Sequence, residues 1–408
     1  MLVKNNNFDN FIAQRVKYTE YAIRDVAVEA EKLKKMNKKI VDFSVGDPIK
    51  NGFDVPKELK KGLCKAVYEG HNYYADPVGE YETREAIAKK EKMHNNISID
   101  PENIIIGNGI SEVFLIFSAA LFDKGDEILV PNPTYPIFFT YPRFFGAKVV
   151  YYKCDESNEW QPDLEDIKRK LNKRTKAIVI VNPNNPTGSI YSKEVLIEIA
   201  KIAKEKNLML IADEIYDHNI IEGKFYSLAS IVKDWPVFGF NGISKCYFAT
   251  GWRFGYMYIA NPDKKTEQIK DAVAKIARMR AYTNAPIQRA AQYLMKKEPF
   301  KQKFMFEIRK RRDYFMKRLD EIADISYVRP RGAFYIFPNI GALVKNKVVK
   351  DDKDFVFSIL RTHGLLFVHG SGFGPAGKNH FRSVFLPDKE KIDMCFDIME
   401  KFLRKRSN

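Results

Sequence analysis

Residues 241–256 read NGISKCYFATGWRFGY and directly follow a short apolar run, residues 237–240. Within this segment Lys245 comes after a serine, and Arg253, with a glycine nearby on each side, comes eight positions later. A lysine carried at the end of a buried strand loses the hydration of its charge, and this desolvation lowers the pKa of its amine. An amine of that kind can form a Schiff base with a carbonyl compound. The segment therefore predicts a catalytic lysine, with a solvated surface lysine as the alternative.

The whole chain has 408 residues, 45% of them hydrophobic, which is enough for two or three domains or for one large and one small domain. Its first forty residues lack the apolar core of a signal peptide, and no run approaches the roughly 20 apolar residues that span a bilayer. The four cysteines and six histidines are scattered, without the spacing of a metal site. These features predict a soluble cytoplasmic protein with reduced thiols, no bound metal and no membrane association.

The chain is strongly basic, with a formal net charge of +16. Its basic residues are mixed with acidic ones, as in KKEK at 89–92 and RKRRD at 309–313, rather than gathered in one arm. This mixing predicts a solvated basic surface and no nucleic-acid partner. Such a surface also suits anionic small molecules, such as phosphates and dicarboxylates.

Short apolar runs alternate with helical patterns through the middle of the chain. A helix is predicted over 111–121, after a strand and a Gly-Asn-Gly turn. The predicted strands cover residues 104–106, 127–130, 148–152, 177–181, 208–212, 237–240 and 257–259. Buried strands separated by helices indicate an α/β fold with a mainly parallel sheet covered on both faces. Ligands of such folds bind at the carboxyl ends of the strands.

The two ends of the chain predict a second, smaller α+β domain. The N-terminal end contributes a helix over 18–35 and a strand over 40–45, and the C-terminal end begins with a long charged helical region over 286–319. The predicted division is an N-terminal arm with part of the small domain, a large domain and the C-terminal remainder of the small domain, at 1–54, 55–285 and 286–408.

Two further motifs follow predicted strands. Residues 182–188 read NPNNPTG, and residues 212–216 read ADEIY. With the segment around Lys245, and in this order, they resemble the fold-type I aminotransferases of class I and II. The resemblance extends from Gly46 to Arg382. It implies a large domain built on a mainly parallel sheet flanked by helices, a smaller α+β domain, and pyridoxal phosphate bound as a Schiff base to the lysine.

Three segments are similar to the alanine aminotransferases of archaea and bacteria in particular. They are EYAIRD at 20–25, HNYY at 71–74 and FVHGSGFG at 367–374. The resemblance implies amino acids and 2-oxo acids as substrates.

The resemblance implies roles for four residues around the cofactor ring. Asp213, at the end of an apolar strand, would pair with the protonated pyridine nitrogen and make the ring an electron sink, with a helix N-cap as the alternative. Tyr216 and Asn185 would share the phenolic oxygen of the cofactor, although a core tyrosine and a plain turn are the alternatives. Tyr135 would stack on the ring face, or else belong to the core.

The cofactor phosphate is expected at the start of the predicted helix that follows the first buried strand. Gly109, Ile110 and Ser111 lie there, so free backbone N–H groups and the positive end of the helix dipole would face an anion. A glycine-rich turn alone is weak support, and Arg253 is expected to complete the site.

Two positions qualify this prediction. Some relatives carry a phosphate-binding serine three residues before the lysine, where this chain has Gly242, and Ser244 is expected to replace it. Tyr74 resembles the tyrosine that reaches the phosphate bound by a neighbouring subunit. This resemblance implies a homodimer with shared active sites.

The substrate carboxylate is expected at Arg382, which matches the family arginine that grips the α-carboxylate with both arms of its guanidinium. Gly46 would offer its backbone N–H to the same carboxylate, or else form a plain turn, and Asn185 would contact it too. Arg24, with Tyr21, is predicted to bind the distal carboxylate of glutamate. A solvated charged helix is the alternative.

Together these residues predict an aminotransferase that moves the amino group of L-alanine to 2-oxoglutarate by ping-pong kinetics, giving pyruvate and L-glutamate. Lys245, Asp213 and Tyr216 are its expected catalytic residues. An aspartate or broad-specificity aminotransferase of the same class is the nearest alternative. Carbon–sulfur lyases use the same lysine and aspartate, and a non-catalytic regulator of this fold would carry an added DNA-binding domain, for which the N-terminus leaves no room.

Overall fold

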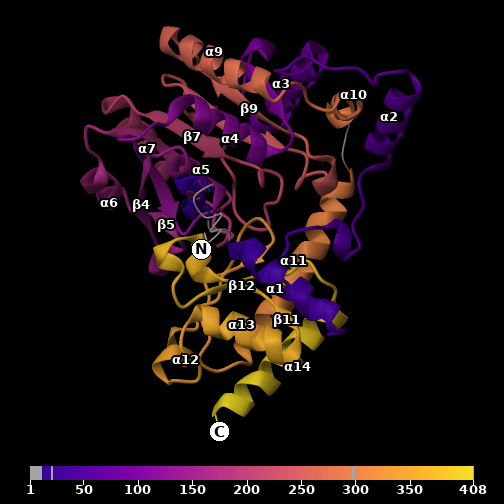
Figure 1. The fold of residues 1–408 in the computed structure, drawn as a ribbon, viewed down its shortest axis with the longest axis vertical. Helices are drawn as coiled ribbons and strands as arrows, with labels where there is room; N and C mark the ends of the chain where they lie inside the picture. The colour runs from indigo at the N-terminus through magenta and orange to yellow at the C-terminus, as the bar shows by residue number, and fades with distance from the viewer. Residues whose placement is uncertain (1–11, 20–21, 296–298, 408) are drawn as a thin grey trace, which may run out of the picture.

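A computed structural model of the chain describes residues 12–19, 22–295 and 299–407. Its largest element is an eight-stranded sheet with the strand order β2-β9-β8-β7-β6-β3-β4-β5. Figure 1 shows this sheet in the upper part of the molecule, where β4, β5, β7 and β9 are labelled. The strands are β2 (Ile104–Gly107), β3 (Glu127–Asn132), β4 (Lys148–Asp155), β5 (Gln161–Pro162), β6 (Thr175–Val181), β7 (Met209–Asp213), β8 (Val237–Gly242) and β9 (Gly255–Ala260). Strands β4, β3, β6, β7 and β8 are parallel, whereas β5 and β9 run antiparallel to their neighbours. The predicted mainly parallel sheet is confirmed.

Helices cover both faces of this sheet. Successive residues of a strand point to opposite faces, so neighbouring residues contact different helices. In β6, Val179 belongs to the apolar cluster that includes α4, α5 and α9, whereas Ile180 belongs to the cluster that includes α3, α6 and α7. Burial on both faces explains why the parallel strands read as continuous apolar runs. The helices of this region are α2 (Lys57–Tyr68), α3 (Tyr81–Asn95), α4 (Ile110–Leu121), α5 (Ile137–Phe144), α6 (Leu164–Lys170), α7 (Lys193–Glu205), α8 (Leu228–Ile231), α9 (Lys264–Met279) and α10 (Ala285–Ala291).

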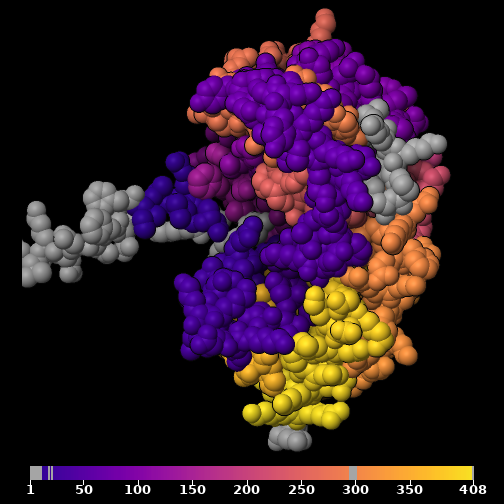
Figure 2. Space-filling model, turned by 90° about the vertical axis from the view of Figure 1, so that its right-hand side faces the viewer, coloured from indigo at the N-terminus to yellow at the C-terminus, as the bar shows by residue number. Residues whose placement is uncertain are grey.

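The two ends of the chain form a smaller α+β part, at the lower end of Figures 1 and 2. Figure 2 shows indigo N-terminal and yellow C-terminal segments lying together there. In a small antiparallel sheet β13 (Phe381–Val384) lies between β10 (Tyr335–Ile336) and β12 (Val368–His369), and β1 (Val41–Asp42) pairs in parallel with β11 (Leu365–Leu366). The helices are α1 (Ala22–Lys35), α11 (Pro299–Asp320), α12 (Gly341–Lys345), α13 (Asp352–His363) and α14 (Lys389–Ser407). A smaller α+β part is confirmed, and the boundaries at 54/55 and 285/286 stay predictions.

Two predicted elements are shorter than expected. The strand predicted over 40–45 is reduced to β1. Just beyond it, the N–H of Phe43 still donates to the carbonyl of Leu366, and the carbonyl of Phe43 accepts the N–H of Val384, both at 2.9 Å. The helical region predicted over 286–319 is divided into α10 and α11. Helix α10 ends at Ala291, and a 3-10 helix over Gln292–Met295 follows it.

The prediction that the basic runs are solvated is wrong at two places. Lys90 and Glu91, within KKEK, are 1% and 0% exposed, and Arg312, within RKRRD, is 0% exposed. Each has a charged partner in the fold: Lys90 pairs with Glu91 and Asp217, and Arg312 pairs with Glu222. A buried charge needs such a partner, which a pattern of mixed charges does not reveal.

Within the described ranges, no helix has the length and apolar character needed to cross a membrane. In the same part of the chain, no group of three or more His, Cys, Asp and Glu side chains is placed to hold a metal ion.

Candidate active site

A cavity of about 360 Å³ opens where the loops after β3, β6, β7 and β8 meet at one edge of the large sheet. Both parts of the molecule contribute to its wall. Of the residues predicted for the site, those that line it are Arg24, Gly46, Ile110, Ser111, Tyr135, Asn185, Asp213, Tyr216, Ser244, Lys245, Arg253 and Arg382. The parallel strands bring Tyr135, Asn185, Asp213 and Lys245 together because their carboxyl ends share one edge, whereas Arg24, Gly46 and Arg382 come from the smaller part.

The amine of Lys245 lies inside this cavity. Its Nζ donates a hydrogen bond to the carbonyl of Gly46 at 2.7 Å and lies 5.6 Å from the ring centroid of Phe334. Burial lowers the pKa of Lys245 to about 8, with the Asp47 carboxylate opposing this shift and the Arg382 guanidinium adding to it. The amine therefore reaches its neutral, nucleophilic form closer to neutral pH than an ordinary lysine does.

Asp213 is the last residue of β7 and is 4% exposed. Burial raises its pKa to about 7, while a hydrogen bond from the N–H of Ile215, at 3.2 Å, opposes the shift. The charge of the neighbouring Asp217 raises it further. A carboxylate in this position is stabilised in its ionised form by any ligand that brings a cationic group into the cavity.

Arg382 lies deep in the wall, 2% exposed. It donates to Oδ1 of Asn185 at 3.1 Å and to the carbonyl of Ser44, and its guanidinium lies 4.6 Å from the ring centroid of Tyr335. Its Nε has no hydrogen-bond partner in the described structure. The same tyrosine shares a hydrogen bond of 2.8 Å with the hydroxyl of Tyr216. This wall offers a buried positive charge whose Nε–H has no hydrogen-bond partner among the described residues, which suits a carboxylate.

An anion cradle lies at the N-terminus of α4. Gly109, the N-cap, has a φ of 83°, and a Cβ there would clash with the guanidinium of Arg253. A Cβ at Gly255 would come within 2.5 Å of the backbone nitrogen of Ile110. Because neither glycine has a side chain, the helix N-terminus and the arginine approach each other closely. With the hydroxyl of Ser111, they form a set of donors that fits a phosphate dianion.

The cavity as a whole fits pyridoxal phosphate. Lys245 offers an amine to the aldehyde, the buried carboxylate of Asp213 suits the ring nitrogen, and the glycine-bordered cradle suits the phosphate. Lys245, Asp213 and Arg253 line one cavity, and Tyr216 and Asn185 line it as well.

Three predicted residues have other outcomes. Gly109 does not line the cavity itself, but it lies against the guanidinium of Arg253, which does. Tyr74 lies away from the cavity of its own chain, 83% exposed, with its ring stacked on Tyr282 at 4.7 Å. Tyr21 lies outside the described residues, although Arg24, from the first turn of α1, lines the cavity.

The cavity also contains residues that the sequence analysis missed. Thr250 donates to Oδ1 of Asp47 at 2.9 Å, which joins the loop after β8 to the N-terminal arm. Asp47 directly follows Gly46, which was predicted to belong to the site, so its position in the sequence could have revealed it. Tyr335 had no such signal, because it is one of several aromatic residues in an apolar run.

Comparisons with known proteins agree with this geometry. The family described as aminotransferase class I and II matches residues 38–397. The glutamate-pyruvate aminotransferase AlaA of Escherichia coli strain K12 is 36% identical over 388 residues, covering 94% of this chain and 95% of the relative. An alanine aminotransferase of Mycobacterium tuberculosis strain H37Rv is 32% identical over 389 residues, covering 94% and 90%. The structure of an alanine aminotransferase from Pyrococcus furiosus, 44% identical, superposes with a TM-score of 0.92 and covers 97% of this chain and 100% of its own.

Proposed function

The chain belongs to the class I and II aminotransferases, and from this membership we propose that it moves the amino group of L-alanine to 2-oxoglutarate, releasing pyruvate and L-glutamate. As a member of the family it depends on pyridoxal phosphate and uses amino acids and 2-oxo acids. The substrate pair is supported by the names of the Escherichia coli and Pyrococcus furiosus relatives. The observation that carries the proposal is the presence of Lys245, Asp213 and Arg382 in the wall of one cavity.

The residues around the ring have distinct proposed roles. Pyridoxal phosphate supplies an aldehyde that takes up the amino group and a ring that withdraws electrons from the substrate. Lys245 would hold this aldehyde as a Schiff base and, once the amino acid displaces it, move the proton of the α-carbon. Asp213 would keep the ring nitrogen protonated. Tyr216 and Asn185 would hydrogen-bond the phenolic oxygen, and Tyr135 would pack on the ring face.

The phosphate would be held at the start of α4. Gly109, Ile110 and Ser111 would donate from the helix N-terminus, and Arg253 would add its charge. Ser244, which lines the cavity beside the lysine, would add a hydroxyl.

The substrate carboxylate would bind Arg382, with help from the amide of Asn185 and the backbone of Gly46. The distal carboxylate of glutamate needs a second cation that leaves the site suitable for the methyl group of alanine. Arg24 is the proposed cation, because it lines the cavity from the exposed first turn of α1, and Tyr21 would assist it.

A panel of amino donors tests the reaction. With 2-oxoglutarate as acceptor, L-alanine should give a higher kcat/KM than L-aspartate, and a preference for aspartate would contradict the proposal. Arg24→Ala should lower kcat/KM for glutamate about tenfold or more and change that for alanine less than about twofold. Lys34→Ala is the matched control, because Lys34 is exposed on the same helix and pairs with Glu31. Equal losses for both substrates would exclude Arg24 as the distal cation.

We also propose a homodimer with shared sites, in which Tyr74 reaches the phosphate bound by the neighbouring subunit. Its exposure in the single chain supports this role. Lys245→Ala and Tyr74→Ala, each of low activity alone, should regain up to about a quarter of wild-type activity when refolded as a mixture, since mixed dimers hold one intact site. No recovery in mixtures that contain mixed dimers would contradict shared sites.

A further inference from the structure

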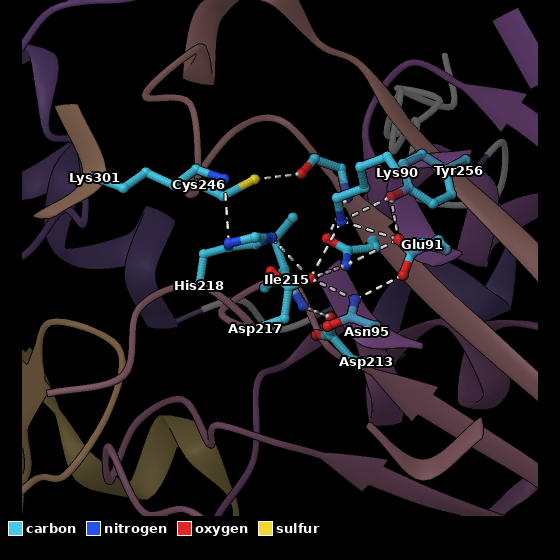
Figure 3. A network of polar contacts seen from close by, with 12 residues as sticks. Lys90, Glu91, Asn95, Asp213, Ile215, Asp217, His218, Cys246, Tyr256 and Lys301 are labelled. Atoms are coloured by element: carbon cyan, nitrogen blue, oxygen red, sulfur yellow. Dashed lines mark hydrogen bonds and ion pairs between the residues drawn. The ribbon is translucent and has the colours of Figure 1, made fainter. Parts of the chain in front are cut away.

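A second group of polar side chains is buried next to Asp213 (Figure 3). We refer to Lys90, Glu91, Asp217, Asn241 and Tyr256 as the Asp217 cluster, and none of them lines the cavity. Lys90 Nζ lies 2.9 Å from Oε1 of Glu91 and 3.2 Å from Oδ2 of Asp217, and the hydroxyl of Tyr256 donates to Glu91 at 2.5 Å. Two carboxylates and one ammonium are therefore held together out of contact with solvent.

Asp217 is the centre of this cluster. Besides pairing with Lys90, its Oδ2 accepts hydrogen bonds from the side-chain amides of Asn95, at 2.9 Å, and Asn241, at 2.8 Å. Burial opposes ionisation, but the charges of His218 and Lys90 and the hydrogen bonds from the two amides hold the pKa of Asp217 below its ordinary value. The Nε2 of His218 lies 3.6 Å from Oδ2 of Asp217. Lys90 Nζ is closer, at 3.2 Å, and its own pKa lies well above the ordinary value, so its ammonium stabilises the ionised form of Asp217.

Asn241 connects Asp217 with the segment of Lys245. Its Nδ2 donates to Asp217, and its Oδ1 accepts the N–H of Gly242 at 2.7 Å. The carbonyl of Gly242 in turn accepts a hydrogen bond from the thiol of Cys246 at 3.1 Å. Both ends of the short turn that carries the catalytic amine are therefore fixed by polar contacts that begin at Asp217.

The cluster also reaches the strand that follows the phosphate arginine. Tyr256 faces Asn241 across the β8–β9 pair and lies three positions after Arg253. Asp217 itself lies four positions after Asp213. The segments that carry the ring aspartate, the amine and the phosphate arginine thus meet in one buried set of contacts.

We propose that Asp217 is a positioning residue of the active site, which acts through Asn241 to set the Lys245 amine relative to Asp213. The proposal rests on the function proposed above for Lys245. Burying a charge in this way adds little to stability compared with a well-packed apolar group, whereas three directed contacts to one oxygen fix an orientation. The amine must meet the cofactor aldehyde and later the α-proton, and both steps depend steeply on geometry.

Asp217→Asn tests the proposal, because it keeps the shape of the side chain and removes its charge. We expect kcat to fall about 10- to 100-fold while KM for alanine changes less than about threefold. The visible circular dichroism of the loaded enzyme, which reports how the cofactor is oriented, should change at equal cofactor content. Asp166→Asn is the matched control: Asp166 is 3% exposed and paired with Lys170 at 2.6 Å, away from the cavity, and its replacement should leave kcat and the dichroism unchanged.

The route through Asn241 is tested by combining variants. Asn241→Ser keeps the Lys90–Asp217 pair but removes the amide, so it should lower kcat by a similar factor. In the Asn241→Ser background, Asp217→Asn should lower kcat by less than about a further threefold, because both substitutions break the same chain of contacts. If Asp217→Asn folds poorly, Asn241→Ser alone decides. Wild-type kcat and dichroism in the variant that folds would overturn the proposal. Fully additive effects of the two substitutions on the activation free energy in the double variant would also overturn it. Retained turnover in Lys245→Ala would instead overturn the function of the lysine.

Discussion

Charged side chains lie partly or fully buried on the two sides of Asp213, but they behave in opposite ways. In the cavity, burial lowers the pKa of Lys245 to about 8 and raises that of Asp213 to about 7. In the Asp217 cluster, burial is outweighed, and the pKa of Lys90 lies well above its ordinary value because Asp217 and Glu91 stabilise its charge. Where the protein supplies the counter-charge, the groups hold a structure together. Where a ligand must supply the counter-charge, the pKa values of the groups lie close to neutral pH, so both protonation states are accessible to the chemistry.

Removing the amine from the cavity side should have the largest effect. Lys245→Ala should lower turnover at least about a thousandfold, because it removes the proposed anchor of the cofactor and the proposed base for the α-proton. Borohydride reduction followed by mass spectrometry should find the cofactor covalently attached to the wild-type chain and not to the variant. Lys204→Ala, an exposed lysine paired with Asp234, should keep both properties. Transamination at a wild-type rate in Lys245→Ala would end the assignment.

Changing the carboxylate grip should have the next largest effect. Arg382→Lys keeps a positive charge but loses the planar fork, which should lower kcat/KM for alanine about 10- to 100-fold. Arg331→Lys, at an exposed arginine paired with Glu159, is the control and should change it less than about twofold. Equal values for the two variants would show that a point charge is sufficient at Arg382.

The contrast between the two sides should appear directly in the stability of the cofactor-free protein. The folded-state pKa of Asp213, about 7, lies above its ordinary 3.8, so its contribution to stability is lost as pH rises from about 4 through 7. Asp213→Asn should therefore raise Tm by a few degrees at pH 8 and by less at pH 5. The pKa of Asp217 is lowered instead, so its contribution is present above pH 4 and lost in acid.

Asp217→Asn should accordingly lower Tm by a few degrees at pH 7, with a smaller difference below about pH 4. Thermal unfolding of the two variants and the wild type at about pH 3, 5, 7 and 8 measures both trends. Shifts of the same sign in the two variants at pH 8 would remove the distinction between the two sides.

The smallest effect is expected where the cavity wall has a satisfied hydrogen bond. Tyr335→Phe removes the 2.8 Å contact with Tyr216 and should lower kcat about two- to tenfold. Tyr327→Phe, whose hydroxyl donates to Asp320 at the surface, should leave steady-state kinetics unchanged. A larger loss than in Arg382→Lys would give Tyr335 a direct part in the chemistry.

The sequence predicted the cavity far better than it predicted the Asp217 cluster. Lys245, Asp213 and Asn185 lie in short motifs at strand ends, and the topology of a parallel sheet then brings strand ends together. Lys90 and Glu91 lie in a helix among other charges, where a buried pair and a solvated pair have the same spacing. Only the packing of α3 against the large sheet distinguishes them.

Tyr335 shows a different limit. It reaches the cavity because β10 pairs with β13, which places its hydroxyl beside Tyr216 and its ring beside Arg382. These strands are two and four residues long, and their apolar patterns do not identify the partner of either. Pairings between such short segments depend on the assembled tertiary structure rather than on local pattern.

The parallel pairing of β1 with β11 has a consequence for synthesis of the protein. Val41 faces Leu365 across this pair, so the turn that begins at Gly46 and receives the Lys245 amine can be placed only after most of the chain has left the ribosome. The large sheet ends at Ala260 and can assemble earlier. A nascent chain stalled between these points would hold a formed cofactor cradle with an unplaced lysine partner, open to solvent and to proteases.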